Sequence, residues 1–300
     1  MMLLKAFATP LAKMTGACIG LSPALLEVFR SRTFRGKHLI AGALPETLPV
    51  ASGIYRCNGL MYDLDLTDQI QRDVYLGVYE QQEREFLRSY VQPGWTCVDI
   101  GANIGFYTLL LATLAGPSGH VYAIEASPKN FARLSRNVAL NALTQCALSS
   151  VAITAKNGAV SFLTSPETNS GWGRIAGTDT GREIISLDGL TFDHFVRTQG
   201  IHSVDFLKVD IEGHELSLLE GGQKTLESGV VKRALVEFCG YHMEKRNTTL
   251  ADFIAAFERL GFRPCRFSMD KVESARRGTY APQGEILNLL LEHAALSART

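Results

Sequence analysis

The residues best suited to chemistry begin in a short segment from Asp99 to Gly105, which reads Asp-Ile-Gly-Ala-Asn-Ile-Gly. The apolar run 96–98 precedes this segment, and an apolar helical pattern over 106–111 follows it. A strand, a tight turn and a helix start, in this order, place free backbone N–H groups against a ligand. The glycines Gly101 and Gly105 allow the backbone to approach that ligand closely.

The spacing of these glycines distinguishes between classes of ligand. A dinucleotide fingerprint reads G-x-G-x-x-G, with its third glycine inside the helix. Here the two glycines are four positions apart, and no further glycine occurs before Gly116. The segment therefore favours a ligand that combines an amino acid with a nucleoside, and a nicotinamide-dependent oxidoreductase is the weaker interpretation.

Two further predicted strands also end in acids, at Glu125 and Asp210. Because the carboxyl ends of parallel strands meet at one edge of a sheet, these acids and Asp99 should surround one crevice. An acid at the end of the second strand can bind the two hydroxyls of a ribose. Glu125 is therefore the predicted ribose ligand, whereas Asp99 either contacts the cofactor or caps the glycine turn.

The segment 208–215, Lys-Val-Asp-Ile-Glu-Gly-His-Glu, concentrates charge at a strand end. Asp210 and Glu212 alternate around one residue, so both side chains can face the pocket. In the alternative interpretation Glu212 and Glu215 only favour the start of a helix. Another strand brings Glu237, and His242 follows. The catalytic candidates are Asp210, Glu212, Glu237 and His242, and because their spacing is not compact, no metal is expected.

These residues are positioned by alternating strands and helices, which predict an α/β fold with a doubly wound, mostly parallel sheet covered on both faces. The expected core strands are 96–98, 120–125, 145–153, 204–210, 232–238, 262–267 and 286–292. The expected helices start at 106 and cover 128–141, 215–227 and 250–260. Short extra strands are expected at 158–163, 173–175 and 182–187, followed by a helix from Leu187 and Asp188 to Val196.

The N-terminal part, 1–70, is expected to be an extension added to a main domain at 71–300. It should contain a helical lead-in over 1–36 and a small β-hairpin or meander between 50 and 68, and helical character follows over 68–91. Charged and helix-breaking residues interrupt the apolar start, so no membrane span is expected. An amphipathic helix could still contact a membrane surface.

Composition excludes some functional classes. The 300 residues include 30 basic and 30 acidic side chains, so the chain lacks the charge of a general nucleic-acid binder and no nucleic-acid partner is expected. Six scattered cysteines form no C-x-x-C pair. Buried, reduced thiols and a cytoplasmic location, possibly peripheral to a membrane, are the corresponding expectations.

Taken together, the motifs resemble the FkbM family of S-adenosylmethionine-dependent methyltransferases, which have a class I methyltransferase fold. The resemblance is carried by Asp99–Thr108, Glu125–Pro128, Ser186–Asp188 and Phe206–Glu215, and extends from about Gly77 to Glu237. It implies a seven-stranded sheet with an antiparallel last strand and S-adenosyl-L-methionine as cofactor. The implied contacts are Gly101 to Gly105 with the methionine part, Glu125 with the ribose, and Val151 and Ala152 with the adenine. The full set of candidate cofactor-binding residues is Glu80, Asp99, Gly101, Ala102, Asn103, Gly105, Tyr107, Thr108, Glu125, Ala126, Val151, Ala152 and Asp210.

The resemblance further implies O-methylation of a hydroxyl on a sugar, glycolipid or other natural product. An alcohol is a weak nucleophile until its proton is removed, so one of the four catalytic candidates would act as general base. The acceptor pocket is expected in 158–185, where Trp172 is a candidate for stacking on a sugar, and in 239–249. Because a fold does not fix a function, a non-catalytic cofactor-binding partner protein is the alternative. The sequence leaves the oligomeric state open.

Overall fold

The computed structural model describes residues 22–297, apart from 33, 35, 46–47, 177–182 and 281–283. The chain forms two compact units. The first contains residues 1–89 and 166–170, and the second contains residues 90–165 and 171–300. Each unit is described by itself below. Among the described residues, no helix combines the length and the apolar character that crossing a bilayer requires.

The first unit combines short helices with a β-hairpin. Its elements are α2 (Pro23–Ser31), α3 (Lys37–Ala41), β1 (Gly53–Cys57), β2 (Leu60–Leu64), α4 (Gln69–Leu76) and most of α5 (Gln81–Tyr90). The predicted hairpin is confirmed, because β1 and β2 pair in antiparallel register. The helical character expected over 68–91 is interrupted, since Gly77 takes a left-handed conformation with φ of 71° and ends α4. The lead-in is helical over 23–31, and the possible membrane-contacting helix before it lies outside the described residues.

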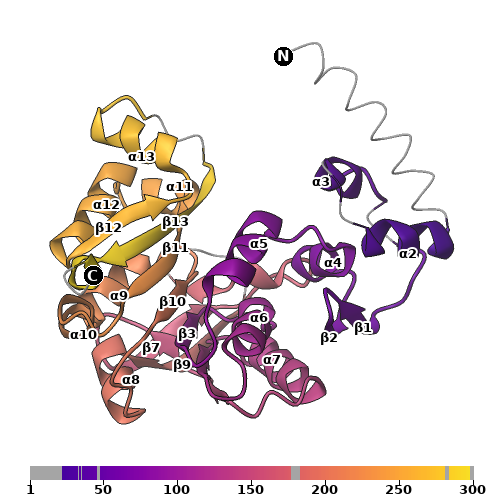
Figure 1. The fold of residues 1–300 in the computed structure, drawn as a ribbon, viewed down its shortest axis with the longest axis horizontal. Helices are drawn as coiled ribbons and strands as arrows, with labels where there is room; N and C mark the ends of the chain where they lie inside the picture. The colour runs from indigo at the N-terminus through magenta and orange to yellow at the C-terminus, as the bar shows by residue number, and fades with distance from the viewer. Residues whose placement is uncertain are drawn as a thin grey trace. The chain divides into compact units, whose positions relative to one another are not determined.

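A seven-stranded sheet forms the centre of the second unit (Figure 1). Its strand order is β12-β13-β11-β10-β3-β4-β5. The first three strands of this sheet in chain order, β3, β4 and β5, lie on one side of the switch between β3 and β10, and the last four lie on the other. The strands are β3 (Thr96–Ile100), β4 (His120–Ile124), β5 (Cys146–Ser149), β10 (Phe206–Val209), β11 (Arg233–Cys239), β12 (Phe262–Arg266) and β13 (Ile286–His293). Only β13 runs antiparallel to its neighbours, so the predicted sheet with an antiparallel last strand is confirmed.

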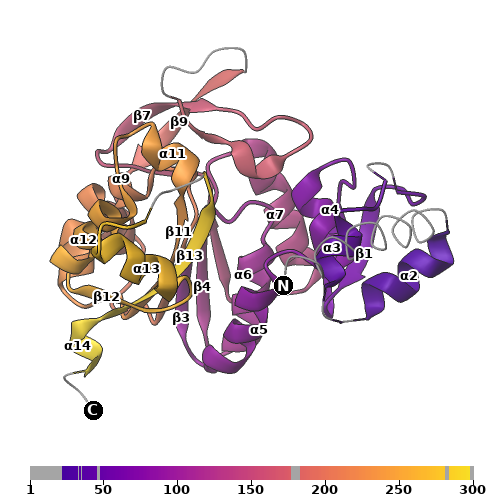
Figure 2. The same ribbon diagram turned by 90° about the horizontal axis from the view of Figure 1, so that it is seen from above.

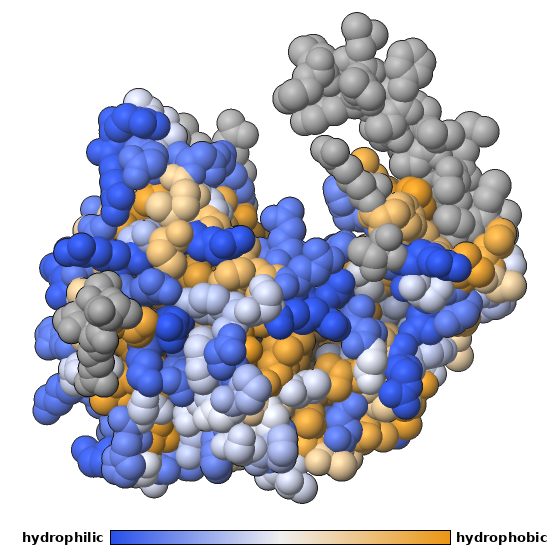
Figure 3. Space-filling view, in the orientation of Figure 1, coloured by the Kyte–Doolittle hydropathy of each residue, from blue (hydrophilic) through white to orange (hydrophobic). Residues whose placement is uncertain are grey.

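Helices cover both faces of this sheet. Figure 2 shows α6 and α7 on one side and α9 and α12 on the other. All four residues of β10 are buried, as expected for a central parallel strand covered on both faces. Hydrophilic side chains form the outer surface near α13 (Figure 3). The helices are α6 (Phe106–Ala115), α7 (Pro128–Leu140), α8 (Phe192–Thr198), α9 (Glu215–Gly221), α10 (Gln223–Glu227), α11 (Gly240–Glu244), α12 (Leu250–Arg259), α13 (Met269–Arg276) and α14 (Ala294–Ser297).

A second, four-stranded sheet corrects two sequence predictions, and a helix break corrects a third. Its order is β6-β9-β7-β8, with β6 (Ala152–Ile153), β7 (Gly158–Leu163), β8 (Arg174–Ile175) and β9 (Ile184–Leu190). The strand expected over 145–153 ends at Ser149, because β6 pairs with β9 in this other sheet. Leu187 and Asp188 belong to β9 rather than to the start of a helix, and α8 begins only at Phe192. The single helix expected over 215–227 breaks at Gly222 into α9 and α10.

Candidate functional site

The glycine loop is tied to the ends of two neighbouring strands. The N–H groups of Gly101 and Ala102 both donate to the carbonyl oxygen of Ile124, at 2.9 and 3.0 Å. Gly101 has a φ of 83°, and a Cβ atom there would lie 1.7 Å from the carbonyl oxygen of Asp210. Only glycine fits such a close approach of two backbones, which packs the loop onto the end of β10.

Buried polar groups support this loop from below. Asp99 and Thr108 are both buried, and the Thr108 hydroxyl donates to Oδ2 of Asp99 at 2.6 Å. Burial raises the pKa of Asp99 to about 6. Lys208, the buried register neighbour of Asp99 on β10, places its Nζ 5.0 Å from the centre of the Tyr107 ring and 3.4 Å from Oδ2 of Asp210. Asp99, Thr108, Tyr107 and Lys208 thus stabilise the base of the loop.

Glu125 links the loop to the start of α7. Its Oε2 accepts the N–H of Asn103 at 2.7 Å, and its Oε1 accepts the N–H of Ser127 at 2.8 Å. Ser127 is the N-cap of α7, as the Ser-Pro pair predicts. The carboxyl group of Glu125 is buried, which raises its pKa to about 7. Because each carboxylate oxygen can accept more than one hydrogen bond, both oxygens remain able to accept a hydroxyl from a ligand.

The residues of this loop fit a cofactor that combines a ribose with an amino acid. Asn103 has a φ of 50°, and its buried Oδ1 has no hydrogen-bond partner among the described residues. A buried acceptor without a donor is costly, and an ammonium group would satisfy it. The carboxylate of Glu125, which Ala126 follows, is of the type that accepts ribose hydroxyls. We conclude that the donor set suits S-adenosylmethionine.

The remaining predicted cofactor ligands lie in different places. Val151 is half-buried after β5, and Ala152 is buried in β6. Both therefore follow β5, the strand next to β4, and their contact with an adenine stays a prediction. Glu80 belongs to the first unit, directly before α5, and has a left-handed φ of 39°. Its contact with the cofactor stays a prediction.

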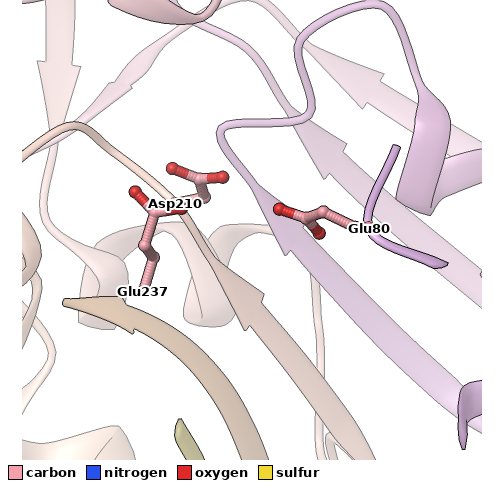
Figure 4. A group of neighbouring side chains, drawn as sticks. All are labelled: Glu80, Asp210 and Glu237. Carbon is pink, nitrogen blue, oxygen red and sulfur yellow. The ribbon is translucent and has the colours of Figure 1, made fainter. Parts of the chain in front are cut away.

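Two acids meet where Asp210 follows β10 and Glu237 lies near the C-terminal end of β11. Asp210 and Glu237 have carboxylate oxygens within 4.8 Å of each other (Figure 4). Glu237 is buried, and Asp210 is partly exposed. The sequence placed Glu237 on the substrate side together with His242, and its proximity to Asp210 was not predicted. Two carboxylates at this separation favour a cationic group between them.

A carboxylate and an imidazole form the second pair of the site. Nε2 of His242, on α11, lies 3.1 Å from Oε2 of Glu212. Glu212 has a left-handed φ of 52°, and a Cβ on the next residue, Gly213, would lie 2.5 Å from Cβ of His242. Burial raises the pKa of Glu212, while the hydrogen bond from His242 opposes that rise. The strained loop therefore aims Glu212 at His242.

Glu215 holds this loop in place. Its Oε1 accepts the N–H groups of Ile211 and Gly213 at 3.1 and 3.3 Å, and its side chain is buried at the start of α9. Burial raises the pKa of Glu215 to about 7. The interpretation in which Glu212 and Glu215 are only charges at a helix start is therefore wrong for both: one pairs with His242, and the other fixes the loop backbone.

Sequence reasoning missed a group of basic side chains beside this pair. His214 places Nε2 3.2 Å from the carbonyl oxygen of Ile175 on β8, and Nη2 of Arg246 lies 3.0 Å from its Nδ1. Burial, with Arg246 nearby, lowers the pKa of His214 to about 4. Arg174 lies on β8, two residues after Trp172, which is 56 % exposed. The predicted acceptor segments contain Trp172, Arg174 and Arg246, but only the fold brings Arg174 and Arg246 to one histidine.

Comparison with known proteins decides the family. Residues 99–264, more than half of the chain, match the family model described as the methyltransferase FkbM domain. The chain belongs to the FkbM methyltransferase family. This FkbM domain contains the glycine loop, Glu125 and both side-chain pairs, Asp210 with Glu237 and Glu212 with His242, whereas Glu80 lies before it. The predicted family is confirmed, and with it the predicted cofactor, S-adenosyl-L-methionine; the nicotinamide-dependent interpretation is not favoured.

Individual relatives share only part of this FkbM protein. It is 31 % identical over 130 residues to the hexuronic acid methyltransferase AglP of Haloferax volcanii. This match covers 43 % of this chain and 51 % of the relative. It is 33 % identical over 91 residues to an arsenite methyltransferase of Halobacterium salinarum. This match covers 30 % of this chain and 22 % of the relative. The chain thus spans about half the length, or less, of these two curated relatives.

Among solved structures, an FkbM methyltransferase from Methylobacillus flagellatus KT is similar to this chain with 17 % identity and a TM-score of 0.42. The matched part covers 75 % of this chain and 55 % of that structure.

Proposed function

We propose that this protein is an S-adenosylmethionine-dependent O-methyltransferase that acts on a hydroxyl of a sugar, free or within a glycolipid or another natural product. The observation that carries the proposal is the pair formed by Glu212 and His242, at 3.1 Å, beside the strand end onto which the glycine loop packs. The pair can take a proton from an alcohol. The similarity to a hexuronic acid methyltransferase supports a sugar acceptor.

The cofactor would be held at the edge formed by β3, β4 and β10. Gly101 to Gly105 would hold its methionine part, Glu125 its ribose hydroxyls, and Val151 with Ala152 its adenine. The carboxylates of Asp210 and Glu237 would favour the cationic groups of the cofactor, because opposite charges attract strongly where water is excluded. Bound S-adenosylmethionine supplies a methyl group that is already activated, so the protein mainly aligns the acceptor and excludes water.

The proton of the acceptor hydroxyl would pass to the pair of Glu212 and His242. An ionised Glu212 can only accept, so Nε2–H of His242 would donate to this carboxylate, which leaves Nδ1 as the atom that accepts a proton. The carboxylate then stabilises the imidazolium that forms. Asp210 and Glu237 remain the other candidates for the base.

The test replaces the carboxylate without changing its shape. Glu212→Gln should lower kcat by roughly a hundredfold, the lower end of general-base contributions, while the affinity for S-adenosylhomocysteine stays within about twofold of wild type. Glu220→Gln, an exposed change on α9, serves as the matched control. An unchanged kcat in Glu212→Gln would remove this pair from the mechanism and leave Asp210 and Glu237.

The cytoplasm is the proposed compartment. The five cysteines in the described part of the chain are all free thiols, and most of them are buried. Such thiols are typical of proteins in a reducing environment.

A further inference from the structure

The side chain of Arg246 lies beside the proposed catalytic pair without an acidic partner. Its Nη2 contacts both ring nitrogens of His214, at 3.0 Å from Nδ1 and 2.8 Å from Nε2. The carbonyl oxygen of Ile175 can only accept, so the ring tautomer that satisfies it carries the proton on Nε2 and leaves Nδ1 to accept from Arg246. Among the residues that the structure describes, no carboxylate lies within ion-pairing distance of this guanidinium.

The partner of Arg246 is an uncharged group. The low pKa of His214, about 4, keeps its ring neutral near pH 7. Burial is the main cause, and the positive charges of Arg246 and Arg174 add to it. A neutral ring orients a guanidinium but does not neutralise it, so the charge of Arg246 remains available to a ligand.

This positive charge lies next to the groups proposed for catalysis. His214 follows Glu212 by two residues, and its ring is fixed to β8 through Ile175. Arg174, the other residue of β8, interacts electrostatically with both Glu212 and His214. Two arginines from distant segments, one on β8 and one after α11, therefore approach His214, and Arg174 also interacts with Glu212.

We infer that the acceptor of this enzyme is an acidic sugar, whose oxyanion is bound by Arg246 with help from Arg174 while a neighbouring hydroxyl faces Glu212 and His242. This inference rests on the proposed sugar O-methyltransferase function. A planar guanidinium forms paired, charge-assisted hydrogen bonds with a carboxylate or a phosphate. The exposed Trp172, two residues before Arg174, suits the apolar face of the same sugar ring.

The experiment measures binding, so it does not depend on turnover. Methyl β-glucuronide, glucose 6-phosphate and the neutral methyl β-glucoside are titrated into the full chain with saturating S-adenosylhomocysteine, and the dissociation constants are determined by NMR. We expect at least one charged sugar to bind roughly tenfold more tightly than the glucoside, as a charged hydrogen-bonded pair allows. The better of the two charged probes identifies the oxyanion as carboxylate or phosphate.

Variants assign this preference to the arginine. Arg246→Ala should reduce it to less than about threefold without weakening glucoside binding, and Arg246→Lys should restore only part of it. Arg197→Ala is the matched control, because Arg197 also donates to a histidine, Nδ1 of His194 at 2.9 Å, on the exposed surface of α8. Arg197→Ala should keep the full preference.

Two results would overturn the inference. The first is equal binding of charged and neutral sugars, or no detectable binding of either charged probe. The second is an Arg246→Ala variant that keeps the preference for the charged sugar. Failure of the proposed function gives a different pattern. In that case Arg246 would still select charged sugars, but no methyl group would be transferred to them.

Discussion

The carboxyl group of Glu125 should make cofactor binding depend on pH. In the protein without ligand, burial raises the pKa of this group to about 7. The ribose hydroxyls would donate hydrogen bonds to the carboxylate oxygens of Glu125, and such bonds favour the ionised form of this carboxyl group. If the cofactor binds that form alone, the competent fraction rises from roughly one tenth at pH 6 to roughly nine tenths at pH 8. The affinity should therefore rise roughly tenfold over this range.

The assay is calorimetric titration with S-adenosylhomocysteine at pH 6, 7 and 8, for the wild type and for two variants. Glu125→Gln removes the titrating group, so its affinity should be lower and should lose the tenfold rise. Glu215→Gln is the matched control, because burial raises the pKa of Glu215 to the same value, about 7, at the other loop. The amino group of the ligand titrates equally in all three proteins, so the difference between them isolates Glu125.

The reasoning would be refuted by a wild-type affinity that changes less than about twofold between pH 6 and pH 8. It would equally be refuted if Glu125→Gln kept the whole pH dependence, because another group would then be responsible.

Three further predictions concern stability and the loops. Gly101→Ala should destabilise the fold by at least about 3 kcal/mol in urea unfolding, because its Cβ would overlap the Asp210 carbonyl. Gly200→Ala, also at a positive φ but with open space around the Cβ, should cost only about 1 kcal/mol. Glu215→Ala should lower the free energy of unfolding by about 1 to 3 kcal/mol, because it leaves two buried N–H groups without an acceptor. Glu215→Gln keeps an acceptor and should lower the free energy of unfolding by less. Equal losses in the two variants would contradict the role of Oε1. The acids Glu125 and Glu215 have pKa values raised to about 7, so their contribution to stability is present at low pH and is lost as the pH rises. The free energy of unfolding without ligand should therefore fall by about 1 to 2 kcal/mol between pH 6.5 and pH 8. A constant or rising free energy of unfolding would contradict this.

The central sheet could be predicted from sequence because its signals are local. Each core strand is a short apolar run ending in an acid or a turn, and the alternation with helices leaves few topologies. The errors lie where tertiary contacts override local pattern. The strand expected up to Ile153 ends at Ser149 because β6 pairs with β9, far along the chain. Gly222 breaks the expected helix where a Cβ would meet the carbonyl of Leu218 and the side chain of Phe192.

In the site, as in the sheet, residues with a local sequence signal could be predicted and those that depend on tertiary contacts could not. Residues at strand ends, such as Glu125 and Asp210, could be placed because parallel strands share one edge. The pairing of Glu212 with His242 could not, because it depends on a left-handed residue and on a short helix, α11, that sequence reasoning missed. Arg246 has no local signal at all: its role follows from the position of His214, which is set by a backbone contact with β8.

The most direct test of the proposed function is the transfer of an isotopically labelled methyl group from S-adenosylmethionine to acidic and neutral sugars, followed by mild alkali. A methyl ether on a hydroxyl resists alkali, whereas a methyl ester on a carboxylate is cleaved. We predict an alkali-stable, labelled sugar that forms with the wild type and is reduced roughly a hundredfold with Glu212→Gln. No labelled sugar, or a label that alkali releases entirely, would contradict O-methylation of a hydroxyl by this protein.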